Sequence, residues 1–265
     1  MSVDKLILFI KSHPCFNHPI FINWAEMAPD QVVVGALFHQ IRSFCDSTRP
    51  AHAFSDGLVK NGLAKESCLV QQIAESEEDH GPELATMAGY ILNKMSKNII
   101  FSDLYDQNTI EAYLKSNSDS LLGHLPGYDR ETGLLIQTKV ARNVFEGRKK
   151  TDLHSVLKNL GAMIALEMIS NGQLIPGEKH CLIDSGLYKV SLEDKEMHYL
   201  AEHWGEAGAE AMHEQTAQEA VKAVMTADNK DLVFSGAKDF LDSLLALWDT
   251  LNAALLGSGY LRKVS

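Results

Sequence analysis

Apolar residues in this chain recur three or four positions apart over long stretches, which is the spacing of one face of an α-helix. Only seven prolines interrupt the 265 residues. Stretches that alternate apolar and polar residues, as a half-buried strand does, are hard to find. The sequence therefore predicts an all-α fold. No repeat, low-complexity tract or linker divides the chain, so we expect one helical domain over residues 1–265.

Prolines, glycines and capping residues set the expected helix boundaries in the first half of the chain. Pro29 is expected to open a helix, and the next helices should follow the break at Thr48-Arg49-Pro50. The helix over 65–91 should bend at Gly81-Pro82, because proline removes a backbone donor. The expected helices of this half are 29–44, 50–61, 65–91, 109–115 and 134–145, with a turn-rich stretch over 123–133.

In the second half, Thr151 is the expected N-cap of a helix over 152–170. A connection that contains glycine and proline is expected over 171–190. The Ser191-Leu-Glu-Asp194 segment resembles a capping box and predicts one long helix that continues past Val224. A last helix is expected over 237–256.

Charge and cysteine content exclude several classes of function. With 24 Lys and Arg against 35 Asp and Glu, the formal charge is −11, which disfavours nucleic acid and anionic membranes as partners. The longest apolar run near the start, Leu6–Ile10, is too short for a signal peptide or a membrane span. Four scattered cysteines without a CxxC pair fit reduced thiols, so we expect a cytoplasmic protein.

Three predicted helices carry acidic residues or histidines on the face that should be buried. Helical residues turn by about 100° each, which places Glu77 and His80 in the apolar stripe of the third helix. Glu167 falls in line with the apolar residues of the helix over 152–170. The strongest pattern lies on the long helix, where an arc of about 80° collects four polar residues: His203, Glu206, Glu210 and His213.

A buried carboxylate must be protonated, paired with a cation or bound to a metal, because the loss of its hydration is costly. No Arg or Lys lies on these three faces. Two Glu-x-x-His units together with two further glutamates favour iron or manganese over a closed zinc site. The candidate metal ligands are therefore Glu77, His80, Glu167, Glu206, Glu210 and His213.

Each of these features also has a plainer interpretation. Glu77 lies within the acidic run 75–79, and such runs usually form a solvated face. Glu167 fits a capped core carboxyl as well as it fits a ligand. The four polar residues of the long helix fit the solvent-facing side of an amphipathic helix.

Order and spacing of these motifs resemble the haem-oxygenase-like di-metal oxidases, relatives of the TenA and PqqC proteins. The similar segments are EEDHGPEL with Glu77 and His80, GAMIALEMI with Glu167, and EAGAEAMH with Glu206, Glu210 and His213, preceded by Asn17-His-Pro-Ile-Phe21. The resemblance implies that these residues hold two irons, or manganese, and that the enzyme uses dioxygen to oxidise a small organic substrate such as a fatty acid or an amino acid derivative. It also makes a homodimer plausible.

The sequence departs from the family pattern in its long helix. The family's first histidine there falls at Glu206 and its aspartate at Glu210, and His203 is a possible replacement for the missing imidazole. The resemblance further implies that substrate enters between the N-terminal helices, near His39, Gln40 and Arg42, although such residues more often lie on a helix surface.

Other classes remain open at this point. A ferritin-like four-helix bundle needs nearly the same ligands, with its fourth carboxylate near Asp46. A metal-free TenA-like thiaminase would need a cysteine nucleophile, for which Cys45, Cys68 and Cys181 are available. A PqqC-like cofactorless oxidase and a non-catalytic small-molecule binder are the remaining alternatives.

Overall fold

A computed structural model describes residues 2–48, 52–76, 80–146, 149–205 and 208–264. These residues form helices and connecting loops, and the one strand-like pairing among them is an isolated bridge between Asp129 and Leu134. The predicted all-α class is confirmed. The α-helices are α1 (Val3–Ser12), α2 (Ile20–Met27), α3 (Gln31–Cys45), α4 (His52–Lys60), α5 (Ala64–Ser76), α6 (His80–Met95), α7 (Gln107–Leu122), α8 (Ile136–Glu146), α9 (Leu153–Ile169), α10 (Ile175–Lys179), α11 (His198–His203), α12 (Ala209–Val224) and α13 (Lys230–Val264).

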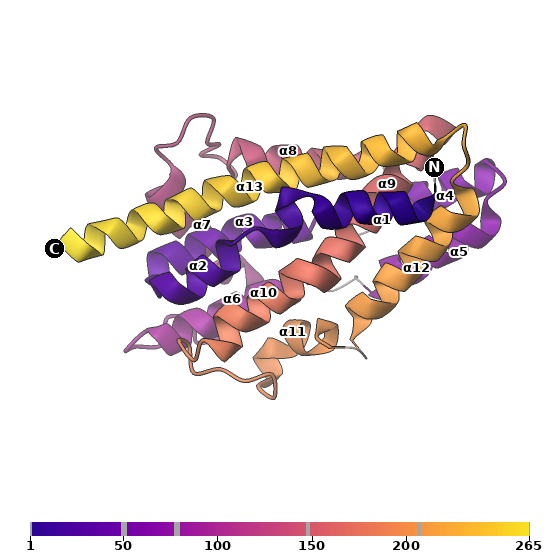
Figure 1. Ribbon diagram of the computed structural model, residues 1–265. Coiled ribbons are helices and arrows are strands. Elements are labelled where there is room, and N and C mark those ends of the chain that lie inside the picture. The colour runs from indigo at the N-terminus through magenta and orange to yellow at the C-terminus, as the bar shows by residue number, and fades with distance from the viewer. Residues whose placement is uncertain (1, 49–51, 77–79, 147–148, 206–207, 265) are drawn as a thin grey trace.

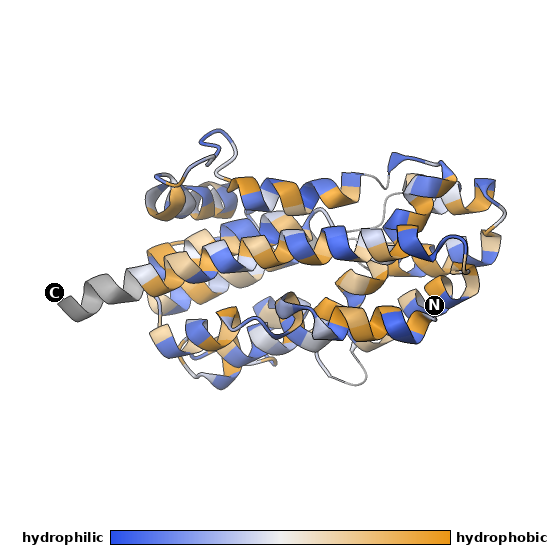
Figure 2. Cartoon of the chain, turned by 45° about the horizontal axis from the view of Figure 1, so that its top comes forward, coloured by the Kyte–Doolittle hydropathy of each residue, from blue (hydrophilic) through white to orange (hydrophobic). Residues whose placement is uncertain are grey.

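The long helix α13 runs along nearly the whole molecule and packs on α9, α8 and α2 (Figure 1). On other sides of the core, α3 packs on α7 and α6, and α12 packs on α9 and α5. Hydrophobic and hydrophilic residues alternate along the helices (Figure 2), and the buried hydrophobic residues form one shared core. Because α9 contacts both α12 and α13, its inward residues lie in the interior of the bundle.

Two glycines let α9 and α13 approach closely. A Cβ atom added at Gly161 would lie 1.8 Å from the Val233 carbonyl oxygen, and one added at Gly236 would lie 1.9 Å from the Lys158 carbonyl oxygen. Neither contact is sterically possible, so only glycine allows the two backbones to meet at this point. This contact fixes the position of α9, the helix that carries Glu167.

The predicted connection over 171–190 is wrong for most of its length. Helical backbone continues from α9 through the π-helical turn η3 (Ser170–Leu174), α10 and a second π-helical turn, η4 (His180–Asp184). Pro176 lies just after the first π-helical turn, where the regular α-helical hydrogen-bond pattern is already interrupted. The proline therefore does not end the helix, and the wider turns on either side change its register.

The predicted long helix from Ser191 past Val224 is also wrong. A short 3₁₀ turn, η5 (Lys195–Met197), leads into α11, which ends at His203. Trp204 then has extended backbone, Gly205 has a φ of +94°, and Gly208 is the N-cap of α12. A φ of +94° is open to glycine and strained for other residues, so the chain turns between the two helices.

Smaller differences concern caps and lengths. Asp30 caps α3 by accepting a hydrogen bond from the Val33 N–H, and Asp152 caps α9 through the Ser155 N–H. Each cap lies one position after the residue predicted to begin or cap the helix. The expected helices over 109–115 and 237–256 are parts of the longer α7 and α13.

Candidate metal centre

Glu167, Glu210 and His213 meet inside the bundle. Glu167 lies two residues before the end of α9, and the other two lie in the first two turns of α12, which packs on α9. Each residue offers one ligand atom such that all three atoms lie within 4.8 Å of one another. The distance from His213 Nδ1 to Glu167 Oε2 is 3.7 Å. One ion could therefore contact all three side chains.

All three side chains are buried, and Glu167 is only 1% exposed. Burial, and to a smaller extent the neighbouring His203, lowers the pKa of His213 to about 4. The ring is therefore neutral near pH 7 and keeps a nitrogen lone pair for a metal. A neutral histidine carries no charge to offset two carboxylates, whereas a bound cation would offset their charge. This donor set fits a carboxylate-rich metal site.

His203 lies beside this group and has a defined tautomer. The ring is buried, and its Nδ1 lies 2.6 Å from the Tyr199 carbonyl oxygen, which can only accept a hydrogen bond. Nδ1 therefore carries the proton, and the lone pair of the neutral ring is on Nε2. Its centroid is 6.5 Å from that of His213 and 4.8 Å from that of Tyr199. A backbone-anchored imidazole of this kind is typical of metal ligands.

The structure does not describe the side chains of the other three predicted ligands. Glu77 and Glu206 lie outside the described residues, and His80 is the first residue of α6 with no described side chain. Asp46, the carboxylate of the ferritin-like alternative, follows α3 and lies close to the start of α6: a Cβ atom added at Gly81 would be 2.8 Å from its Oδ1. Asp46 is not one of the three clustered residues.

A small cavity adjoins Glu210. Its volume of about 10 Å³ is roughly the space of a single water molecule. Most of its lining residues were not predicted from the sequence, because they come from α3, the α9–η3 helix and α11 and carry no common motif. They are Phe44, Cys45, Thr48, Leu166, Ser170, Leu174 and Tyr199.

Tyr199 also lines a pocket of about 610 Å³ at the protein surface, together with Pro82, Glu83 and Lys195. The buried Tyr199 side chain thus touches both the surface pocket and the cavity beside Glu210. Among the residues described along the two linings, Tyr199 is the one that they share.

The residues suggested to line an entrance between the N-terminal helices hold the fold together instead. His39 Nε2 contacts the Thr132 carbonyl oxygen, and Gln40 donates to Ser118 Oγ and to the Gly133 carbonyl. Arg42 forms an ion pair with Glu111. His39 and Gln40 are buried, so they neither form a solvent-facing surface nor line any of the pockets described above.

A second group of like composition lies near the surface. Glu83, His198 and Glu202 also offer ligand atoms within 4.8 Å of one another, but His198 is 64% exposed. His198 Nε2 lies 3.8 Å from Glu83 and 3.5 Å from Glu202. Water can solvate these groups, so they need no ion.

No family model, curated protein or solved structure matches this chain. The haem-oxygenase-like family therefore stays a prediction based on the sequence motifs. Among the described helices, none has both the length and the apolar character required to cross a membrane.

Proposed function

We propose that this protein is a metal-dependent oxidase that uses dioxygen to oxidise a small organic substrate, with two irons held in the helical bundle. The observation that carries the proposal is the meeting of Glu167, Glu210 and His213 in a buried position. In this proposal the sequence motifs supply the remaining ligands: Glu77, His80 and Glu206.

The donor chemistry favours iron, with manganese as the alternative. Carboxylate oxygens and a neutral imidazole suit these metals, whereas a structural zinc site usually holds thiolates or more imidazoles. Bound iron would supply the electrons and open coordination positions that dioxygen activation requires. The chain would hold the ligands rigidly, since Glu167 projects from α9, which meets α13 in the close backbone contacts at Gly161 and Gly236.

The protein residues around the centre would keep it dry and control access. The cavity beside Glu210 has a volume of about 10 Å³, which leaves no room for bulk water, and Phe44, Leu166 and Leu174 line part of it. Tyr199 lines both that cavity and the surface pocket of about 610 Å³. We therefore infer that substrate enters through that pocket. A fatty acid or an amino acid derivative remains the proposed substrate class.

Anaerobic loading with Fe(II), followed by exposure to oxygen, tests the proposal. We expect about two irons per chain, as in other di-iron carboxylate proteins, and consumption of dioxygen that depends on the bound iron. Glu167→Gln should lose both. Glu202→Gln is the matched control, because it removes the same charge from the exposed group and Glu202 does not line the surface pocket. Equal iron content and oxygen consumption in the two variants would contradict the proposal.

One observation favours a second candidate function, a thiol-based hydrolase. Cys45 and Glu210 line the same cavity, which brings a potential nucleophile near a carboxylate. Of the other two candidate cysteines, Cys68 is exposed, and burial raises the pKa of the Cys181 thiol well above its ordinary value. Hydrolysis of a thiamine-like substrate by metal-free protein, lost in Cys45→Ser, would favour the hydrolase. Full iron-dependent oxygen consumption in Cys45→Ser would favour the oxidase.

A further inference from the structure

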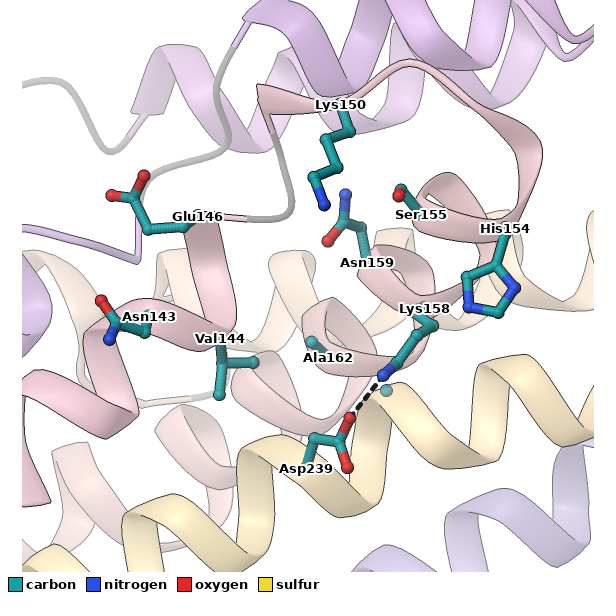
Figure 3. Close-up of a pocket in the computed structure, with 11 residues that line it drawn as sticks. Asn143, Val144, Glu146, Lys150, His154, Ser155, Lys158, Asn159, Ala162 and Asp239 are labelled. Carbon is teal, nitrogen blue, oxygen red and sulfur yellow. Dashed lines mark ion pairs between the residues drawn. The ribbon is translucent and has the colours of Figure 1, made fainter.

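A polar pocket of about 460 Å³ lies between α8, α9 and α13 (Figure 3). None of its lining residues belongs to the candidate metal centre. Its charged and polar side chains come from all three helices and from the segment before α9. Those that carry the argument are Glu146, Lys150, Lys158, Asn159 and Asp239.

The acidic side chains of this pocket are already neutralised. Lys158 Nζ lies 2.6 Å from Asp239 Oδ2, and Glu146 forms an ion pair with Lys149, which does not line the pocket. Lys150 has no ion pair or hydrogen bond within the described part of the chain. The pocket therefore carries one uncompensated positive charge, in a protein whose formal net charge is −11.

Asn159 supplies a second unused donor. It is only 4% exposed, and its Nδ2 is a buried nitrogen for which the described residues provide no hydrogen-bond acceptor. Figure 3 shows the Lys150 side chain extending into the pocket toward the Asn159 amide. A buried amide donor without an acceptor is costly, so native proteins rarely leave one unsatisfied. The two donors are directed into one space, where a single acceptor can bind both.

We propose that this pocket binds the oxyanion group of a small ligand, a phosphate or a carboxylate, between Lys150 and Asn159. An oxyanion accepts hydrogen bonds from both donors and also neutralises the ammonium charge. A water molecule would satisfy the amide but leave the charge unbalanced. The volume of the pocket leaves room for the remainder of a small metabolite. The Lys158–Asp239 pair would face that remainder.

Isothermal titration calorimetry at low ionic strength, with the full chain, tests this proposal. Inorganic phosphate and acetate are titrated separately, and the anion that binds identifies which of the two groups the pocket accepts. We expect saturable binding of at least one anion. Lys150→Met and Asn159→Leu should each weaken it about tenfold or more, because each loses a hydrogen bond to a charged ligand.

Lys149→Met is the matched control, since it removes the same charge one residue away but outside the pocket. It should bind like the wild type. Circular dichroism checks that Asn159→Leu folds, and Lys150→Met is an exposed substitution that does not depend on this check. Absence of saturable binding of both anions by the wild type would overturn the proposal. So would equal weakening in Lys149→Met and Lys150→Met.

Discussion

Two groups of identical composition, each with two glutamates and one histidine, occupy very different surroundings in this protein. Glu167, Glu210 and His213 lie in the interior, where Glu167 is 1% exposed. Glu83, His198 and Glu202 lie near the surface, where His198 is 64% exposed. The spacing of ligand atoms is similar, so geometry alone does not separate the two groups. Solvent does.

Water and salt screen the exposed group, and ion pairs of this kind contribute about 0–1 kcal/mol to stability. The buried group lacks that screening. Removing carboxylates from water costs several kcal/mol per ion, unless a proton or a cation compensates. Composition therefore indicates which metal a group could bind, whereas burial indicates whether the fold needs one.

The largest expected effect is the metal-dependent stability of the buried group. Mn(II), which needs no anaerobic handling, should stabilise the wild type by about 4 kcal/mol when its concentration is a thousandfold above Kd. Glu210→Gln should lose this stabilisation because it removes a buried ligand. Glu202→Gln should keep it. Urea denaturation with and without Mn(II) measures the difference, and equal metal effects in the two variants would place the site elsewhere.

A third buried carboxyl sharpens the comparison, since Glu178 is 2% exposed and belongs to neither of the two groups found among the described residues. Burial raises its pKa from an ordinary value of 4.5 to about 8. The folded state therefore keeps the proton while the unfolded state releases it. The free energy of unfolding should fall as the pH rises from 4.5 to about 8.

Glu178→Gln removes this titration. The variant should be more stable than the wild type by about 3 kcal/mol at pH 7, and the difference should vanish near pH 4.5. Urea denaturation at both pH values measures it. Glu219→Gln, on the exposed side of α12, is the control for the loss of a glutamate side chain at a solvated position. A stability difference that does not change with pH would show that Glu178 is ionised in the folded protein.

A substitution of His203 tests whether the buried metal centre includes a residue of α11. The Nε2 lone pair of His203 is fixed by the hydrogen bond between Nδ1 and the Tyr199 carbonyl. His203→Ala should weaken Mn(II) binding about 10- to 100-fold, the usual effect of losing a residue that orients or completes a site. His198→Ala, on the same helix but exposed, should not. Unchanged affinity in His203→Ala would show that His203 is not part of the centre.

The smallest expected effect belongs to the exposed group. Glu83→Gln should change the free energy of unfolding by about 0.5 kcal/mol or less, because its partner His198 is solvated. Added salt should reduce even this difference. If the free energy of unfolding fell as much as it does when a buried charge is removed, the exposed group would have to bind an ion.

The sequence predicted what depends on regular helical spacing. Glu167 was identified because it interrupts the apolar stripe of α9, and Glu210 and His213 because they lie three residues apart on α12. Both helices are regular at these positions, so the angular argument holds. The structure brings these three side chains together, as the pattern predicted.

The predictions based on residue spacing were wrong where the backbone departs from a regular α-helix. Glycines occur inside many helices, so Gly205 and Gly208 did not reveal the turn between α11 and α12. Pro176 indicated a loop, whereas the π-helical turns around it keep the chain helical. The cavity beside Glu210 and the donors of the polar pocket depend on contacts between distant segments, and no local pattern encodes them.

Anomalous X-ray diffraction from crystals of iron-loaded protein tests the central claim most directly, since it locates the metal without reference to activity. We predict the strongest anomalous peak between Glu167, Glu210 and His213. A strongest peak at Glu83, His198 and Glu202, or no peak within reach of the buried carboxylates, would contradict the account.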